Sequence, residues 1–302
     1  VLIQPFFVMN QSNQAIKTRL LGLAVTTAVG LGAVISGQAL DLKKGEHVVL
    51  IGNSLAERMQ HHGWLESYVQ GSMAKKELVF RNHGFAGDKV NNRPRNQNFP
   101  SADAYLEISK ADVILAFWGY NESFDNSPDA YRADLAKWVD ETNGKKYNGK
   151  SAPRLVLLSP IAHENLGQAN LPDGSANNER LAKYTEATRQ VANEKGVEFV
   201  DLFTLSQELY EGSEKPLTIN GIHLTSEGNQ LLAQGIYRNL FGKAPKVGKR
   251  KLGRIRDAVL NKNWHWYNRY RATDGNDVWG GRSGLAFVNK QTNRTVLQHE
   301  LK

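Results

Sequence analysis

The feature of this sequence that most constrains its fold is a regular alternation between short apolar runs and longer amphipathic segments. The segments between the runs carry apolar residues at helical spacing. Near-continuous apolar runs are typical of strands buried on both faces of a parallel sheet. The alternation therefore predicts an α/β fold with a flavodoxin-like, doubly wound, five-stranded parallel sheet over residues 40–242. The predicted strands lie at residues 47–51, 77–82, 112–117, 154–159 and 197–201.

The N-terminal segment has the composition of a secretory signal peptide. Residues 9–19 are basic and free of acids, residues 20–35 form an uncharged apolar run, and Gly37 and Ala39 have the spacing of small residues at a cleavage site. We therefore predict a signal peptide with an upstream extension over residues 1–39. The alternative is an uncleaved membrane anchor. The apolar run disfavours it, because a spanning helix needs roughly 20 residues and the run is slightly shorter.

Cleavage of this segment changes the expected charge and location of the protein. It removes Lys17 and Arg19 and no acid, so the net charge falls from +8 to +6. The mature protein is then expected to be exported, to the periplasm or the extracellular space, with no stable membrane span.

The chain contains no cysteine. A protein of this size can fold on its hydrophobic core without disulfides. The absence of cysteine also excludes thiolate zinc sites, a cysteine nucleophile and covalently attached haem within this sequence. No cofactor and no metal is expected.

The last part of the chain, residues 243–302, is predicted to be a basic, aromatic-rich extension that could begin a further module. Residues 243–256 contain seven Lys or Arg and no acid, which favours attraction to anionic surfaces. A solvated linker that leads into a basic helix is the favoured alternative. The aromatic residues between Trp264 and Trp279 could stack on sugars, although packing against the main domain is favoured. No nucleic-acid partner is expected.

Polar residues follow each predicted strand, where ligands bind in an open parallel sheet. Each has a structural interpretation of its own, such as a helix cap for Ser54, a turn for Gly87 or a buried loop histidine. Together they supply a hydroxyl nucleophile, a histidine to accept its proton and donors for an oxyanion, which are the groups that acyl transfer needs. In chain order these residues are Ser54, Gly87, Asn121, Glu122, His163, Asn220 and His223.

Four blocks that contain these residues, "GNSL", "GFAGD", "GYNE" and "NGIH", resemble the SGNH or GDSL hydrolase family in the same order. The resemblance covers roughly residues 45–242 and implies the SGNH hydrolase fold. It also implies that Ser54 is the nucleophile and His223 the general base. The oxyanion hole would be formed by the backbone N–H groups of Ser54 and Gly87 and by the side-chain amide of Asn121.

Three positions depart from the pattern of that family. Asn53 and Glu122 stand where the family usually has aspartate, at positions that take no part in the bond-breaking step. Asn220 replaces the aspartate that orients the histidine, and the same exchange in a serine protease lowers turnover by about 10⁴. Three possibilities follow: a working Ser–His dyad, another acid such as Asp201 or Glu227, or a domain that binds without turnover.

A wider stretch of the sequence resembles exported proteins of a planctomycete-type group, in which an SGNH domain precedes further modules. On that resemblance, His163 is a candidate for substrate binding; Glu122 is a second candidate, which does not depend on the resemblance. The predicted function is an exported serine esterase that hydrolyses carboxylic esters, chiefly O-acetyl esters of carbohydrate, through an acyl-Ser54 intermediate. The alternative is a catalytically weakened SGNH domain that acts as a glycan-binding or scaffolding module.

Overall fold

A computed structural model describes residues 39–95, 99–271 and 279–300, all within the unit Gly37–Lys302. The predicted signal peptide therefore lies outside the described residues, apart from its last residue, Ala39. Within the described ranges, no helix combines the length and the apolar character that crossing a membrane requires.

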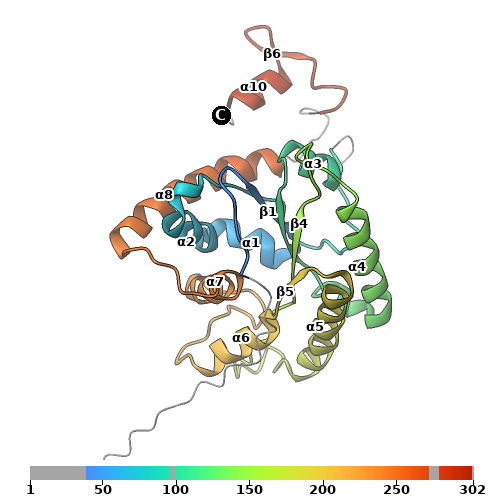
Figure 1. Ribbon diagram of the computed structural model, residues 1–302, viewed down its shortest axis with the longest axis vertical. Helices are drawn as coiled ribbons and strands as arrows, with labels where there is room; N and C mark the ends of the chain where they lie inside the picture. Colours follow the sequence, from blue (N-terminus) through green and yellow to red (C-terminus); the bar gives the residue numbers. More distant parts are fainter. Residues whose placement is uncertain (1–38, 96–98, 272–278, 301–302) are drawn as a thin grey trace, which may run out of the picture. The chain divides into compact units, whose positions relative to one another are not determined.

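The centre of the fold is a parallel sheet of five strands (Figure 1). Their order is β2-β1-β3-β4-β5, as predicted. β2 pairs with one edge of β1, and β3, the next strand along the chain, pairs with the opposite edge. This reversal creates a crevice beyond the carboxyl ends of β1 and β3, where ligands bind in folds of this kind. The strands are β1 (His47–Gly52), β2 (Val79–Asn82), β3 (Val113–Phe117), β4 (Arg154–Leu158) and β5 (Glu198–Val200).

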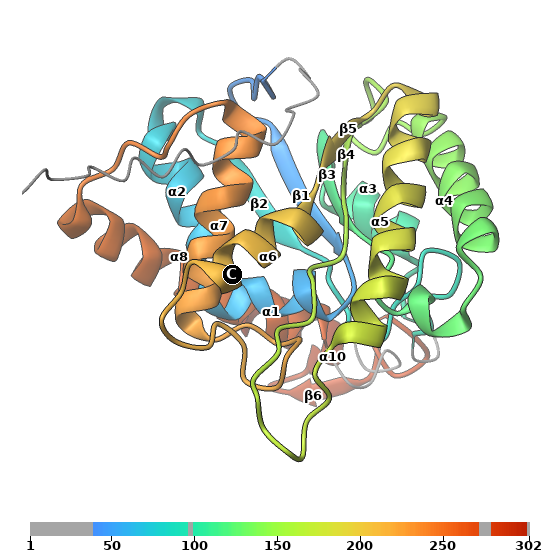
Figure 2. The ribbon, with the colours of Figure 1, turned by 90° about the horizontal axis from the view of Figure 1, so that it is seen from below.

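Helices cover both faces of the sheet, and Figure 2 shows the division. One face is covered by α1 (Ser54–His62), α2 (Trp64–Ser72), α6 (Leu202–Glu211) and α7 (Ser226–Phe241). The other is covered by α3 (Ala102–Ile108), α4 (Pro128–Asn143) and α5 (Ser175–Lys195). Short 3₁₀ helices lie at η1 (Ala74–Lys76) and η2 (Glu122–Asp125). The last described elements are β6 (Ala286–Val288), β7 (Gln291–Thr292) and α10 (Asn293–Glu300).

Each strand divides its side chains between two hydrophobic cores. In β1, Val48 and Leu50 pack with α1, α2 and α7, whereas Val49 and Ile51 pack with α4 and α5. Burying a side chain of this size contributes roughly 1.5 to 3 kcal/mol. Because both faces of the strand are apolar, β1 is fixed rigidly, and so is the loop that follows it.

The basic extension begins with an irregular segment and continues as a long helix, α8 (Lys249–Tyr270), which packs along α1 and α2 and covers the edge strand β2. Trp266 donates its indole N–H to the carbonyl oxygen of Asn82 at 2.6 Å, and Tyr270 donates its hydroxyl to that of His83 at 3.0 Å. Trp264, by contrast, is 63% exposed. Most of the aromatic residues of α8 therefore anchor the helix to the main domain.

Candidate active site

Ser54 is the first residue of α1, directly beyond the carboxyl end of β1. Gly52 permits this turn: its φ is +137°, and a Cβ there would lie 2.2 Å from the carbonyl oxygen of Phe117 on the neighbouring strand. Asn53 caps the helix, because its Oδ1 accepts the backbone N–H of Leu55 at 3.1 Å. The capping role that the sequence allowed for Ser54 therefore belongs to Asn53, and the hydroxyl of Ser54 is available for chemistry.

Ser54 and His223 line the same cavity, which has a volume of about 40 Å³ and lies at the crevice between β1 and β3. Its wall combines residues from the ends of three strands with residues from α1 and from the loop before α7. The remaining lining residues are Asn53, Leu55, Arg58, Phe117, Trp118, Tyr120, Ser159, Pro160, Ile161, Ile222, Leu224 and Asn229.

His223 is held by Asn220, the residue that replaces the usual aspartate. Asn220 Oδ1 accepts the backbone N–H of His223 at 3.0 Å, which identifies that atom as the oxygen. Both Oδ1, at 3.2 Å, and Nδ2, at 3.1 Å, lie within reach of His223 Nδ1. If Nδ1 carries the proton it donates to Oδ1, and Nε2 keeps the lone pair that a general base needs.

The electrostatic surroundings of His223 favour its neutral form. Burial lowers the pKa of His223 below its usual 6.5, and the positive charge of Arg58 lowers it further. Glu57, one turn after Ser54 on α1, acts in the opposite direction. The sequence pattern did not reveal that the carboxylate of Glu57 raises the pKa of His223. Nothing local marks Glu57 except its helical spacing from Ser54.

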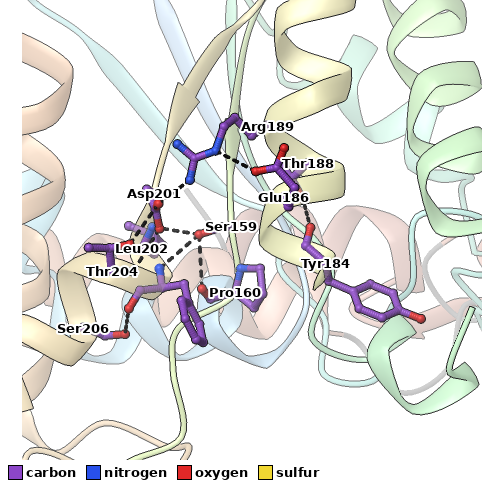
Figure 3. A network of polar contacts seen from close by, with 11 residues as sticks. Ser159, Pro160, Tyr184, Glu186, Thr188, Arg189, Asp201, Leu202, Thr204 and Ser206 are labelled. Carbon is purple, nitrogen blue, oxygen red and sulfur yellow. Dashed lines mark hydrogen bonds and ion pairs between the residues drawn. The ribbon is translucent and has the colours of Figure 1, made fainter. Parts of the chain in front are cut away.

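The two acids that the sequence offered in place of the missing aspartate lie in other environments. Asp201 caps α6 through the backbone N–H of Thr204 at 2.9 Å, and its other oxygen binds Arg189 at 2.7 Å (Figure 3). Its carboxylate is therefore committed to the start of α6. Glu227 is exposed in the first turn of α7. Neither residue is among the charges that shift the pKa of His223.

Gly87 and Asn121, the predicted oxyanion-hole residues, lie on the loops after β2 and β3, and neither is among the residues that line the cavity. Gly87 has a φ of +86°, a conformation that favours glycine, in a turn closed by the backbone N–H of Asp88 and the carbonyl oxygen of Phe85 at 3.1 Å. Asn121 donates one amide N–H to the carbonyl oxygen of Asp88 at 2.8 Å. A side-chain amide has two N–H groups, so the second remains for another acceptor.

Arginines fix the Gly87 loop from two directions. Arg95 binds Asp88 through two hydrogen bonds of 2.8 Å, and the Asp88 side chain is only 1% exposed. The guanidinium carbons of Arg95 and Arg271 lie 4.1 Å and 3.5 Å from the ring centre of Phe85. Arg271, at the end of α8, also forms an ion pair of 3.4 Å with Glu57. The C-terminal extension thus contributes directly to the support of this loop.

Glu122 is placed as a link between loops and does not belong to the cavity wall. It is 4% exposed, and its two oxygens accept the backbone N–H groups of Val90 at 2.8 Å and Gly119 at 2.9 Å. Burial raises its pKa, and these hydrogen bonds act against that rise. Both oxygens are occupied by backbone donors, so its contacts indicate a positioning role where the sequence suggested substrate binding.

His163 is likewise 5% exposed and outside the cavity wall. Its ring lies between Gly174 and Gly221, where an added Cβ would approach ring atoms to 2.6 Å and 2.2 Å. Its Nδ1 lies 2.8 Å from the amide nitrogen of Asn177. The predicted substrate-binding histidine therefore packs against the backbone of the segment that precedes His223.

Glu164, which the sequence reading missed, organises that same segment. Its carboxylate accepts the backbone N–H groups of Leu217 and Thr218 at 2.9 Å and 2.7 Å and the hydroxyl of Thr218 at 2.6 Å. Its own N–H donates to the carbonyl oxygen of Gly221 at 2.8 Å. Its position directly after His163, in a loop that follows β4, was the only available signal. Among the described residues, no group of His, Asp and Glu side chains is arranged to hold a metal ion.

Comparisons with known proteins agree with the fold. Residues 50–231 match the GDSL-like lipase/acylhydrolase family. A curated relative, the GDSL esterase/lipase CPRD49 of Arabidopsis thaliana, is 25% identical over 202 residues, which are 63% of this chain and 77% of the relative.

Solved structures show the same fold. Axe2, an acetylxylan esterase from Geobacillus stearothermophilus, superposes with a TM-score of 0.53 at 19% identity, over 70% of this chain and 100% of that one. A gut microbial diltiazem-metabolizing enzyme, BT4096, gives a TM-score of 0.52 at 18% identity, over 67% of this chain and 48% of its own.

Proposed function

Since the chain belongs to the GDSL-like lipase/acylhydrolase family and is an ester hydrolase, we propose that it removes small acyl groups, acetyl above all, from carbohydrate. The observation that carries this proposal is the placement of Ser54 and His223 in one small cavity. The cavity volume of about 40 Å³ corresponds to roughly three water-sized groups. An acetyl group, with three heavy atoms, fits such a space.

The proposed reaction assigns each step to one of the predicted site residues. Ser54 Oγ attacks the ester carbonyl carbon while Nε2 of His223 takes the hydroxyl proton. The N–H groups of Ser54, Gly87 and Asn121 donate to the oxyanion. The C–O bond to the alcohol then breaks, and His223 returns the proton to the leaving oxygen. A water molecule, activated by His223, releases the acid from Ser54.

The carbohydrate substrate and the export of the protein rest on different grounds. Acetylated xylan is the substrate that the name of Axe2 gives for that esterase, which has the same fold. Export rests on the composition of residues 1–39, and the planctomycete-type group stays a prediction from the sequence. That residues 243–302 begin a further module is likewise a proposal from the sequence.

The esterase proposal is tested with p-nitrophenyl acetate and p-nitrophenyl octanoate, and with acetylated xylo-oligosaccharide as a natural ester. The wild-type protein is expected to hydrolyse the acetate faster than the octanoate, because the acyl space is small. Ser54→Ala is expected to reduce turnover to the background rate. Equal rates for wild type and Ser54→Ala would contradict the proposal.

Asn220 supports one alternative, a domain that binds glycan without turnover. An amide provides no negative charge to stabilise the imidazolium that forms during catalysis. Binding of acetylated oligosaccharide by both wild type and Ser54→Ala, with no release of acetate from either, would favour this alternative.

A further inference from the structure

Arg58 is the one permanently charged side chain among the described residues that line the cavity of Ser54 and His223. It lies on α1 four residues after Ser54, so both residues occupy the same face of the helix. The side chain is half-buried. The rest of the cavity wall is made of apolar side chains and neutral polar groups.

Within the described part of the chain, Arg58 forms no hydrogen bond or ion pair, and its Nε is buried without a partner. Three other half-buried arginines form ion pairs: Arg95 with Asp88, Arg189 with Asp201 and Arg154 with Glu46. Arg93 and Arg269 form none within the described residues, but each guanidinium lies over a tryptophan ring, which Arg58 lacks. The neighbouring acid, Glu57, already accepts the N–H of Ala86 and pairs with Arg271. A buried donor without a partner is unfavourable, so a ligand that satisfies it gains binding energy.

We propose that Arg58 binds a carboxylate carried by the alcohol part of the ester, so that acyl esters of sugar acids are the preferred substrates. This inference rests on the proposed esterase function. A guanidinium recognises a carboxylate through two parallel hydrogen bonds. Under the proposed deacetylation the acyl group carries no charge, so a carboxylate that meets Arg58 belongs to the alcohol part of the ester.

The proposal also accounts for the neutral partner of His223. The positive charge of Arg58 lowers the pKa of His223. A bound carboxylate offsets that charge, and it thereby supplies near the histidine some of the negative charge that Asn220 does not provide.

The kinetic test compares methyl glycosides of acetylated glucuronic acid and acetylated glucose, with the acetyl group at the same position. Wild type is expected to show a kcat/KM about tenfold or more higher for the acid, mainly through KM. Arg58→Gln is expected to remove the preference, and Arg58→Lys to keep part of it. Arg254→Gln, an exposed arginine of α8, serves as the control and is expected to retain the preference. Equal kcat/KM for both esters in wild type, or a preference that persists in Arg58→Gln, would overturn the inference.

A binding test decides the inference independently of turnover. The protein is Ser54→Ala, with and without Arg58→Gln, and the probes are glucuronate and glucose, measured by calorimetry. Glucuronate is expected to bind about tenfold or more tightly than glucose, with the advantage lost in Arg58→Gln and reduced by salt. Equal binding of the two sugars would overturn the role of Arg58 even if p-nitrophenyl acetate is hydrolysed. Failure to hydrolyse any ester would contradict the esterase proposal instead. Far-ultraviolet circular dichroism confirms that each variant is folded.

Discussion

The loop that carries Gly87 and the segment that carries His223 are proposed to serve the same reaction, but they are held by different kinds of interaction. The first is fixed by two arginines, one of which binds the buried carboxylate of Asp88. The second is fixed by Glu164, whose carboxylate accepts only backbone N–H groups and a hydroxyl. Within the described ranges, the hydrogen-bond partner of the imidazole is the neutral amide of Asn220, at Nδ1.

The difference indicates where catalytic power is provided and where it is lacking. Preorganised donors contribute to catalysis only if they are held still, and a buried ion pair with good geometry holds the loop of the proposed oxyanion hole. His223, the proposed base, lines the same cavity as Ser54, but the amide beside its Nδ1 has no charge to stabilise the protonated form. The chemistry is therefore expected to be limited by the histidine side of the site.

Removal of Arg95 breaks the ion pair that holds the Gly87 loop, and its expected effect on the free energy of unfolding is the largest. Arg95→Gln leaves Asp88 buried without its partner, which costs about 3 to 5 kcal/mol of unfolding free energy. Burial already raises the pKa of Asp88, and the hydrogen bonds from Arg95 act against that rise. Without Arg95 the pKa rises further, so the loss of stability grows as the pH rises through it and is relieved in acid as Asp88 is protonated.

Denaturant unfolding at two pH values measures this effect. Arg132→Gln, which breaks an exposed ion pair with Glu194, is the matched control and costs below about 1 kcal/mol. Equal losses for the two variants would show that the buried pair does not support the loop.

Removal of the charge of Glu164 weakens the hydrogen bonds that hold the segment before His223. Glu164→Gln replaces one acceptor oxygen by an amide that faces backbone donors, which costs about 1 to 3 kcal/mol. Because the segment before His223 loosens, kcat is expected to fall more than KM rises. Glu211→Gln, at an exposed position of α6, controls for the loss of a surface charge. An unchanged kcat in Glu164→Gln would mean that the segment is held by other contacts.

Addition of a charge beside the histidine sharpens the comparison. Asn220→Asp is expected to raise kcat about tenfold, because a carboxylate stabilises the imidazolium that an amide leaves unsupported. The measurement is initial-rate hydrolysis of p-nitrophenyl acetate. A decrease in kcat would show that the site is adapted to a neutral partner, in agreement with a charge supplied by the substrate.

The smallest expected effect is the change that Arg58→Gln makes to the pH dependence of turnover. Burial and then Arg58 lower the pKa of His223 below 6.5, so the base stays neutral and turnover is retained down to a pH below that value. Turnover falls as the pH drops through the pKa. Arg58→Gln raises the pKa and moves the acid limb of the kcat profile to higher pH, by less than about one unit. A shift to lower pH would contradict the assigned electrostatics.

The sequence predicted the sheet, its order and the strand ends because apolar runs and glycines are local signals. Glu77, with a φ of +51°, ends the turn after η1 and delays β2 to Val79, two residues later than the apolar run began. The blocks also identified Ser54 and His223, which the structure brings into one cavity.

The residues that hold the loops of the site are not marked by any local pattern in the sequence. Arg271 contacts Phe85, although the two residues are far apart in the sequence. Glu164, in the loop after β4, likewise binds Leu217 and Thr218. Contacts between residues so distant in sequence depend on how α8 and the loops pack. For the same reason, the free guanidinium of Arg58 could be recognised only once its surroundings were known.

The central claim is that Ser54 is a nucleophile activated by His223. Intact-protein mass spectrometry after incubation with a fluorophosphonate probe tests it most directly. The claim predicts one adduct per chain, mapped to Ser54 by peptide digestion, absent in Ser54→Ala and formed much more slowly in His223→Ala. No adduct on the wild-type protein, or an adduct on a different residue, would contradict it.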